Sequence, residues 1–209
     1  MEHQEIQESG WRGSPELWVN AAYETLIEQG VDAVKILTLG ARLKLSRTSF
    51  YWFFKDRQAL LQALADRWAD QTTRPLVASA QAFAATETEA MLNVIGCFLS
   101  DQAFDARLEF AVRGWALQDP KMLSALHSAD AARLAALSAM LGRWGHDTQD
   151  ADVRSRTIYL VQIGYIAMQT RETLETRLNR IPNYVEIYTG RRPTDAEMAR
   201  FRAQVTGGA

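Results

Sequence analysis

The sequence has a single cysteine, Cys97, among its 209 residues. An intrachain disulfide and a metal site built from several cysteines are therefore excluded, and such sparse use of cysteine is typical of a reducing compartment. The most apolar stretch, residues 158–168, is interrupted by Gln162 and is shorter than the roughly 20 residues that span a bilayer. Residues 1–13 have no apolar core of the kind that a secretory signal needs. We therefore expect a cytoplasmic protein without a membrane partner.

The residue patterns of common catalytic sites are also absent. The histidines His3, His127 and His146 do not have the spacing of metal ligands. The sequence contains no glycine-rich phosphate loop, no His-Glu-x-x-His and no Gly-x-Ser-x-Gly. We expect no catalytic residues, no metal and no cofactor, so an enzyme is the weakest of the functions considered.

An excess of one charge is missing from the chain as a whole but present in one segment. The net charge is −2, which excludes a uniformly basic coat for nucleic acid. Residues 35–57 nevertheless carry a net charge of +5, and the remaining chain carries −7. A solvated charged face is the commoner explanation of such a segment, and a compact DNA-docking face is the alternative.

Apolar residues recur with a period near 3.6 residues in nearly every segment, which predicts an all-helical protein. The first helix has Ser14 as its N-cap, Pro15 at its first position and Gly30 as a left-handed C-terminal cap. Thr194 and Glu197 have the spacing of a capping box. Further helices are predicted at residues 36–43, 47–53, 56–73, 76–84, 87–100, 105–117, 120–144, 151–171, 182–189 and 195–205.

The helix at residues 56–73 is predicted to end before Pro75, because a proline disfavours helical geometry in the residue before it. This position divides the sequence into a flexible tail at residues 1–13, an N-terminal domain at residues 14–74 and a larger helical domain at residues 75–209. The N-terminal domain contains the short helices and the basic segment.

Two short helices separated by residues 44–46 fit a helix-turn-helix, in which the second helix enters the major groove of DNA. Ser46 can cap the second helix, so that Arg47, Thr48 and Ser49 occupy its first turn. An ordinary helical hairpin is the alternative, and the spacing alone favours it.

The segment Leu-Gly-Ala-Arg-Leu-Lys-Leu-Ser-Arg-Thr-Ser-Phe-Tyr-Trp-Phe-Phe-Lys-Asp-Arg-Gln-Ala-Leu-Leu at residues 39–61, with Gly-Val-Asp-Ala-Val at residues 30–34, closely resembles the DNA-binding domain of the TetR family of transcriptional regulators. The resemblance covers about residues 14–65. It implies that the first turn of the second helix faces the bases, that Tyr51 and Lys55 hold phosphate, and that Arg57 assists. The complete set of expected DNA contacts is Lys35, Thr38, Lys44, Ser46, Arg47, Thr48, Ser49, Tyr51, Lys55 and Arg57.

Several residues depart from the family pattern. Lys44 replaces a glycine in the turn and is expected to adopt a positive φ, at a cost of about 1 kcal/mol. Gly40 replaces an alanine and weakens its helix by roughly 1 kcal/mol. Ile36 and Leu37 place apolar groups where the family tends to present polar ones, and Phe53 removes a hydrogen-bond donor. These departures concern the operator sequence more than the fold.

The larger domain contains a helix that is apolar nearly all round at residues 158–168, so it must be covered on two sides. One side faces its own core, and the simplest cover for the other is a second copy of the same helix. The resemblance implies the same, because TetR-like regulators dimerise through late helices, here residues 151–171 and the C-terminal helices. A dimer would place two recognition helices about 34–36 Å apart on a roughly palindromic site. A helix fully buried within a monomer is the alternative.

His127 and Asp130 interrupt the apolar stripe of the helix at residues 120–144. A buried carboxylate needs a partner, for which Arg113 is the first candidate and Arg107 the second. We favour a salt bridge that fixes helix packing over a ligand contact.

The resemblance implies a pocket for a small, mainly apolar effector, although each candidate is more often an ordinary core residue. The candidates are Phe98, Phe110, Arg113, Met122, His127, Met140, Trp144, Gln162 and Tyr165. The function implied is that of a ligand-responsive repressor that binds double-stranded operator DNA as a homodimer. The alternative is a small-molecule binding or protein-interaction module whose helix-turn-helix no longer recognises DNA.

Overall fold

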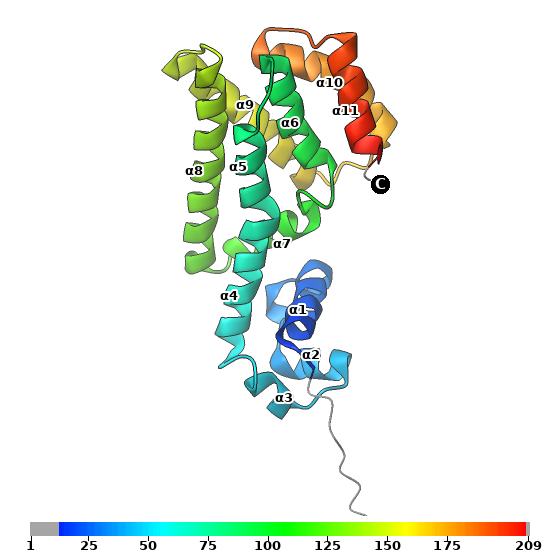
Figure 1. The fold of residues 1–209 in the computed structure, drawn as a ribbon. Helices are drawn as coiled ribbons and strands as arrows, with labels where there is room; N and C mark the ends of the chain where they lie inside the picture. The colour runs from blue at the N-terminus through cyan, green and yellow to red at the C-terminus, as the bar shows by residue number, and fades with distance from the viewer. Residues whose placement is uncertain (1–12, 208–209) are drawn as a thin grey trace, which may run out of the picture. The chain divides into compact units, whose positions relative to one another are not determined.

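A computed structural model describes residues 13–207 (Figure 1). These residues form helices joined by loops, with no strand among them, so the predicted all-helical fold is confirmed. Two short segments are wound differently from the α-helices: η1 is a 3₁₀-helix and η2 a π-helix. The helices are α1 (Pro15–Gln29), η1 (Val31–Ala33), α2 (Ile36–Leu43), α3 (Arg47–Tyr51), α4 (Arg57–Trp68), η2 (Ala69–Thr73), α5 (Arg74–Gln81), α6 (Glu87–Leu99), α7 (Ala106–Ala116), α8 (Pro120–Arg143), α9 (Thr148–Ala167), α10 (Leu174–Thr189) and α11 (Asp195–Gly207).

The chain forms two compact units that divide between Leu64 and Ala65. The boundary expected from the sequence, after Arg74, lies further along the chain. Of the tail expected at residues 1–13, only the last residue belongs to the described part, and His3 lies outside it. No helix within residues 13–207 is long and apolar enough to cross a membrane.

The helical stretch that begins with α4 does not end before Pro75, so this prediction was wrong. The stretch continues through η2 into α5, and the helix expected at residues 76–84 is Arg74–Gln81 instead. Pro75 lies in the first turn of α5, directly after the π-helical segment changes the hydrogen-bond register. A proline is tolerated there because its missing N–H group is not needed in a first helical turn.

The start of α10 was also predicted wrongly. The helix expected at residues 182–189 begins at Leu174, after Thr173 caps it, and Pro182 lies in its interior. An internal proline removes a backbone hydrogen bond. One buried face, which continues on both sides of the proline, offsets that loss; its residues are Leu178, Ile181, Val185, Tyr188 and Thr189.

Sequence signals fixed several helix ends correctly. Ser14 caps α1 by accepting a hydrogen bond from the N–H of Leu17 at 3.3 Å, and Pro15 opens the helix. At the start of α11, the N–H of Glu197 donates to Thr194 Oγ1 at 3.2 Å, and the N–H of Thr194 donates to the Glu197 carboxylate at 2.7 Å. The predicted capping box is therefore confirmed.

Three positions around α2 have backbone requirements of their own. Lys44 has φ 56° and ψ 37°, the left-handed conformation expected for it. Gly30 has φ 82° but ψ 173°, so it is not the left-handed α cap that was predicted, although its positive φ still favours glycine. A Cβ at Gly40 would lie 3.0 Å from the carbonyl oxygen of Leu45. Gly40 therefore weakens the helix but allows the turn to approach it closely.

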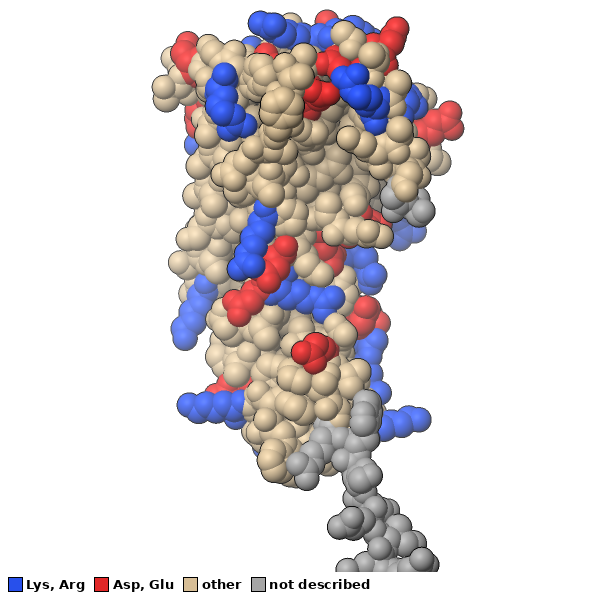
Figure 2. All heavy atoms as spheres, in the orientation of Figure 1, with Lys and Arg blue, Asp and Glu red and all other residues tan. Residues whose placement is uncertain are grey.

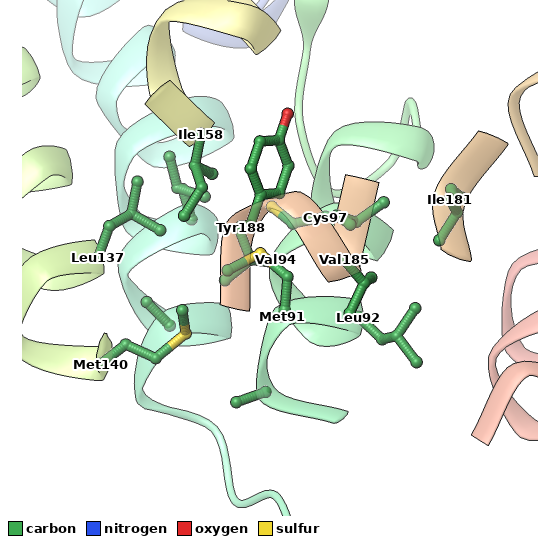
Figure 3. Close-up of a cluster of buried hydrophobic side chains, with 14 of the residues drawn as sticks. Met91, Leu92, Val94, Cys97, Leu137, Met140, Ile158, Ile181, Val185 and Tyr188 are labelled. Atoms are coloured by element: carbon green, nitrogen blue, oxygen red, sulfur yellow. The ribbon is translucent and has the colours of Figure 1, made fainter. Parts of the chain in front are cut away.

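The C-terminal unit, residues 65–207, has one hydrophobic core. Helix α6 packs against α5, α10 and α11, and α8 packs against α5, α7 and α9 (Figure 1). Figure 3 shows side chains from α6, α8, α9 and α10 meeting in this core, among them Met91, Leu137, Ile158 and Val185. Cys97 is buried in the same cluster, and burial raises the pKa of its thiol. The single cysteine is therefore a core residue.

A histidine between two carboxylates joins α6 to the loop between α8 and α9. Nε2 of His146 lies 2.5 Å from the Glu87 carboxylate, and Nδ1 lies 2.5 Å from Asp150. Asp150 also accepts from Nε of Arg154 at 2.8 Å. Burial lowers the pKa of His146, but the hydrogen bonds to Glu87 and Asp150 outweigh it, so the pKa lies above its usual value. Folding thus favours the imidazolium form more than the unfolded chain does.

This raised pKa predicts a pH dependence of stability. A group whose pKa is higher in the folded state contributes stability below its unfolded pKa of about 6.5 and loses that contribution as the pH rises through the folded value. The free energy of unfolding of the wild type, relative to that of His146→Gln, should therefore fall as the pH rises above about 6.5. Urea unfolding at several pH values measures this difference. Glu87→Gln should flatten the profile, and parallel curves for the wild type and His146→Gln would contradict the assignment.

Candidate nucleic-acid interface

Helices α2 and α3 form the helix-turn-helix expected at residues 36–53, although α3 ends at Tyr51. Ser46 caps α3 as predicted, because its Oγ accepts from the N–H of Ser49 at 3.2 Å. Leu39 of α2 and Phe50 of α3 are fully buried, and Trp18 of α1 packs edge-on against Phe50 with ring centroids 5.2 Å apart. This packing fixes the orientation of α3 within the N-terminal unit.

The cations of the basic segment divide into two groups. Arg42 forms an ion pair with Glu28 at 2.8 Å. Arg57 donates from Nε to the carbonyl of Val34 at 2.6 Å and from Nη2 to the carbonyl of Val31 at 2.7 Å. The cations that extend into solvent are Lys35, Lys44, Arg47 and Lys55. Figure 2 shows Lys and Arg side chains projecting from the surface of the N-terminal unit, whose helices are labelled in Figure 1.

The first turn of α3 presents a polar surface. Arg47 extends along the helix and donates from Nη2 to the hydroxyl of Tyr51 at 3.0 Å, with its guanidinium 5.6 Å from the centre of the Tyr51 ring. Thr48 is exposed beside Arg47, and Thr38 is exposed on α2. These donors and acceptors are of the kinds that bind base edges and phosphate.

Two expected contacts are corrected by the structure. Ser49 is buried and its hydroxyl lies 3.1 Å from the hydroxyl of Ser46, so it does not face outward with Arg47 and Thr48. Arg57 is bound to the backbone carbonyls around η1. Through Nε and Nη2 it holds the turn ahead of α2.

Two exposed apolar side chains of the helix-turn-helix segment were not among the expected contacts. Leu37 is 71% exposed on the first turn of α2, and Trp52 is 62% exposed after α3. A hollow of about 410 Å³ is lined by Lys35, Ile36, Leu37, Thr38, Arg47 and Arg57. The signal that could have identified Leu37 is its position off the inward stripe of α2, which contains Leu39.

The expected effector contacts do not form one pocket. Met122, Met140 and Gln162 are buried, Phe98, Arg113, Trp144 and Tyr165 are half-buried, and Phe110 and His127 are exposed. His127 therefore does not interrupt the buried stripe of α8. Gln162 and Tyr165 line a common cavity, but its volume is about 20 Å³, enough for about one water molecule.

The partner predicted for Asp130 is confirmed. Nη2 of Arg113 donates to Asp130 Oδ1 at 2.7 Å and Nη1 donates to Oδ2 at 3.3 Å. Nη2 also donates to the hydroxyl of Tyr159 at 2.9 Å, and this hydroxyl donates to Asp130 at 2.6 Å. Nε of Arg113 donates to Glu109 at 2.9 Å. The second candidate, Arg107, is exposed on α7.

The centre of this cluster is Arg133, which the sequence reasoning missed. Its side chain is fully buried and every N–H group of its guanidinium donates. Nη1 donates to Glu109 at 2.8 Å and to Tyr159 at 2.7 Å, and Nη2 donates to Glu109 at 2.9 Å and to Thr72 at 2.8 Å. Nε donates to Thr73 at 3.1 Å. The cluster thus joins η2, α7, α8 and α9 within the C-terminal unit.

The electrostatics keep the buried cluster charged. Burial raises the pKa of Glu109, but the hydrogen bonds and charges of Arg133 and Arg113 outweigh it and lower the pKa below its usual value. Trp68 adds a hydrogen bond from Nε1 to Glu109 at 2.6 Å. Burial raises the pKa of Tyr159, which therefore stays a neutral phenol. The geometry is that of a structural cluster that fixes helix packing.

No group of three or more His, Cys, Asp or Glu among the described residues is arranged to hold a metal ion.

The comparisons with known proteins agree with this architecture. Residues 19–64 match the family of bacterial regulatory proteins described as the tetR family. A search of curated protein sequences finds no significant match. GusR of Salmonella enterica is 14% identical with a TM-score of 0.58, and the alignment covers 92% of this chain and 93% of that one. A transcriptional regulator from Rhodococcus sp. Rha1 is 17% identical with a TM-score of 0.56, covering 92% of this chain and 97% of that one.

A third solved structure, of a protein assigned to the TetR family from Mesorhizobium loti MAFF303099, is 14% identical with a TM-score of 0.54 and aligns over 91% of this chain and 95% of that one. The resemblance inferred from the sequence is confirmed. The N-terminal domain, residues 19–64, is thus similar to the DNA-binding domain of the tetR family of bacterial regulatory proteins. A larger helical region follows that domain, as in the solved regulators.

Loss of the Arg133 side chain should destabilise the protein strongly, because it leaves Glu109 buried without its main partner. Arg133→Met is expected to lower the free energy of unfolding by about 3–5 kcal/mol. The double variant Arg133→Met/Glu109→Leu should recover most of the loss, since no buried charge remains. Breaking the exposed pair of Arg156 and Asp152 with Arg156→Met is the matched control and should cost under about 1 kcal/mol. Chemical unfolding measures all three, and an equal loss for both single variants would contradict the account.

Proposed function

We propose that this protein is a cytoplasmic, ligand-responsive transcriptional repressor that binds a roughly palindromic operator as a homodimer. The observation that carries the proposal is the exposed surface of α3, where Arg47, Thr48 and Tyr51 stand beside solvent-exposed lysines. In a domain that matches the TetR family, such a surface supports binding in the major groove. The proposed domain roles are DNA binding for residues 14–74 and effector binding and dimerisation for residues 75–209.

The start of α2 supports a phosphate contact. No side chain caps this helix, and Lys35 occupies its N-cap position. The N–H groups of a first helical turn lack partners within the helix and attract anions, which the lysine charge reinforces. Lys44 and Lys55 add positive charge on the same unit. Phosphate contacts of this type position a protein on DNA, and side chains of α3 would then contact the bases.

The surface of α9 supports the dimer. Its inward face buries Ala151, Ile158 and Tyr159, whereas Val153, Leu160 and Met168 are exposed. Val153 and Leu160 are one heptad apart, and Leu160 is 63% exposed, so they form an apolar stripe on the outward face. Ile187 is an exposed apolar residue on the neighbouring helix α10. A second copy of α9 and α10 would cover this surface.

The effector component rests on a groove in the C-terminal unit with a volume of about 560 Å³, within the usual range of small-molecule sites. Its apolar lining includes Leu92, Leu99, Leu174 and Phe201. Binding there would release DNA if the effector favoured a conformation in which the two recognition helices no longer match successive major grooves. The coupling is limited by the difference in its affinity for the two states.

DNA binding is tested with the DNA that flanks the gene of this protein, across a series of salt concentrations. The logarithm of the affinity should fall by about 0.9 per tenfold increase in salt for each phosphate neutralised. Lys55→Ala should weaken all sequences alike and reduce this slope, whereas Arg47→Ala should change the order of preference among operator variants. Lys121→Ala, on the exposed start of α8, is the matched control and should bind as the wild type.

Two results would count against DNA recognition as proposed. Affinity that stays at the nonspecific level on all flanking DNA would favour the alternative module that no longer recognises DNA. Uniform weakening by Arg47→Ala would show that α3 does not contact the bases.

The dimer is tested by placing a charge on the outward face of α9. Leu160→Glu should convert a dimer at micromolar concentration into a folded monomer, because a buried carboxylate without a partner opposes association. Sedimentation measures the mass and circular dichroism the helix content. Leu117→Glu, at a residue that is 85% exposed after α7, is the matched control and should stay dimeric. A monomeric wild type would refute the interface.

A further inference from the structure

The exposed leucine of α2 is surrounded by cations and polar groups. Leu37 is 71% exposed, and the hollow that it lines also contains Lys35, Thr38 and Arg47, all of them exposed. Ile36 is half-buried in the same hollow. A small apolar area within a cationic surface does not match an apolar protein partner, because docking such a partner would desolvate the charges without neutralising them.

The charge of this surface and its continuity with α3 identify the occupant as DNA. The major groove of DNA presents one apolar group on the base edges, the C5 methyl group of thymine. We infer that Leu37 recognises a thymine methyl group in each half of the operator, next to the base that Arg47 contacts. The inference rests on the proposed DNA-binding function and adds a residue of the first helix to base recognition.

The division of roles follows from the chemistry of each group. Leucine offers neither a donor nor an acceptor, so it contributes nothing to a phosphate contact, which Lys35 and the uncapped N–H groups of α2 can make. Arg47 has donors for the acceptors of guanine. Because Leu37 and Arg47 line one hollow of about 410 Å³, the thymine is expected within one or two base steps of the base bound by Arg47.

The contribution of the methyl group can be isolated by replacing thymine with deoxyuridine, which keeps every hydrogen-bonding group and removes only the methyl. The full-length protein is first used to select its preferred duplex from random sequences. Each thymine of that duplex is then replaced singly by deoxyuridine, and affinities are measured at one salt concentration. For the wild type, we expect one thymine in each half-site at which the replacement weakens binding about fourfold, the effect of one buried methyl group.

The leucine is linked to that thymine by a double-mutant cycle. Leu37→Ala should bind the thymine and deoxyuridine duplexes equally, with the affinity that the wild type has for the deoxyuridine duplex. Leu37→Met, which keeps an apolar chain of similar volume, should retain the preference for thymine. Because Leu37 is exposed, the thermal unfolding midpoints of both variants should equal that of the wild type, which excludes an effect through folding.

The outcomes separate this inference from the proposed function. Sequence-specific binding that tolerates deoxyuridine at every thymine, or a Leu37→Ala variant that still discriminates thymine from deoxyuridine, would overturn the role of Leu37 and leave the DNA-binding function intact. Selection that yields no preferred sequence would overturn the DNA-binding function itself, and the inference with it.

Discussion

The buried guanidinium of Arg133 is the interaction on which the C-terminal unit depends. A buried charge is costly, and its cost is offset only when a partner of opposite charge and a full set of hydrogen bonds are present. Arg133 meets both conditions through Glu109 and the hydroxyls of Tyr159, Thr72 and Thr73. These groups come from η2, α7 and α9, so the arrangement of the helices is specified by hydrogen-bond directions in addition to apolar packing.

The N-terminal unit is organised by aromatic packing and by a close turn. Phe50 packs against Trp18 and Phe54, and the turn before α3 closes because Gly40 admits the Leu45 carbonyl and Lys44 adopts a left-handed conformation. The left-handed conformation of Lys44 lowers the backbone stability slightly. In return, the turn carries a positive charge at the proposed DNA contact.

Local signals in the sequence predicted the features that depend on neighbouring residues. The caps at Ser14 and Ser46 and the conformation of Lys44 follow from a few adjacent side chains. The need of a buried carboxylate for a partner also pointed correctly from Asp130 to Arg113, 17 residues away. Other features that depend on distant residues were not predictable. Arg133 and Glu109 are 24 residues apart, and nothing local distinguishes Arg133 from a solvated arginine.

The same limit explains the other errors. The π-helical segment before Pro75 has no propensity signal, so the proline was taken as the end of a helix that in fact continues. Ser49 is polar, as a DNA-contacting residue would be, but it is buried and its hydroxyl lies beside that of Ser46. The sequence identified Leu37 as a departure from the family pattern. Its proposed contact with DNA depends on the cations that the fold brings around it.

The burial of Cys97 has a practical consequence for labelling the protein with spin labels or fluorophores. The chain has no other cysteine, and this thiol is enclosed in the core with a pKa raised by burial, so it reacts slowly with maleimides and disulfide reagents. A cysteine introduced at a surface position would therefore carry a spin label or fluorophore alone. The native sequence therefore serves as the background for site-specific labelling, without first removing a reactive residue.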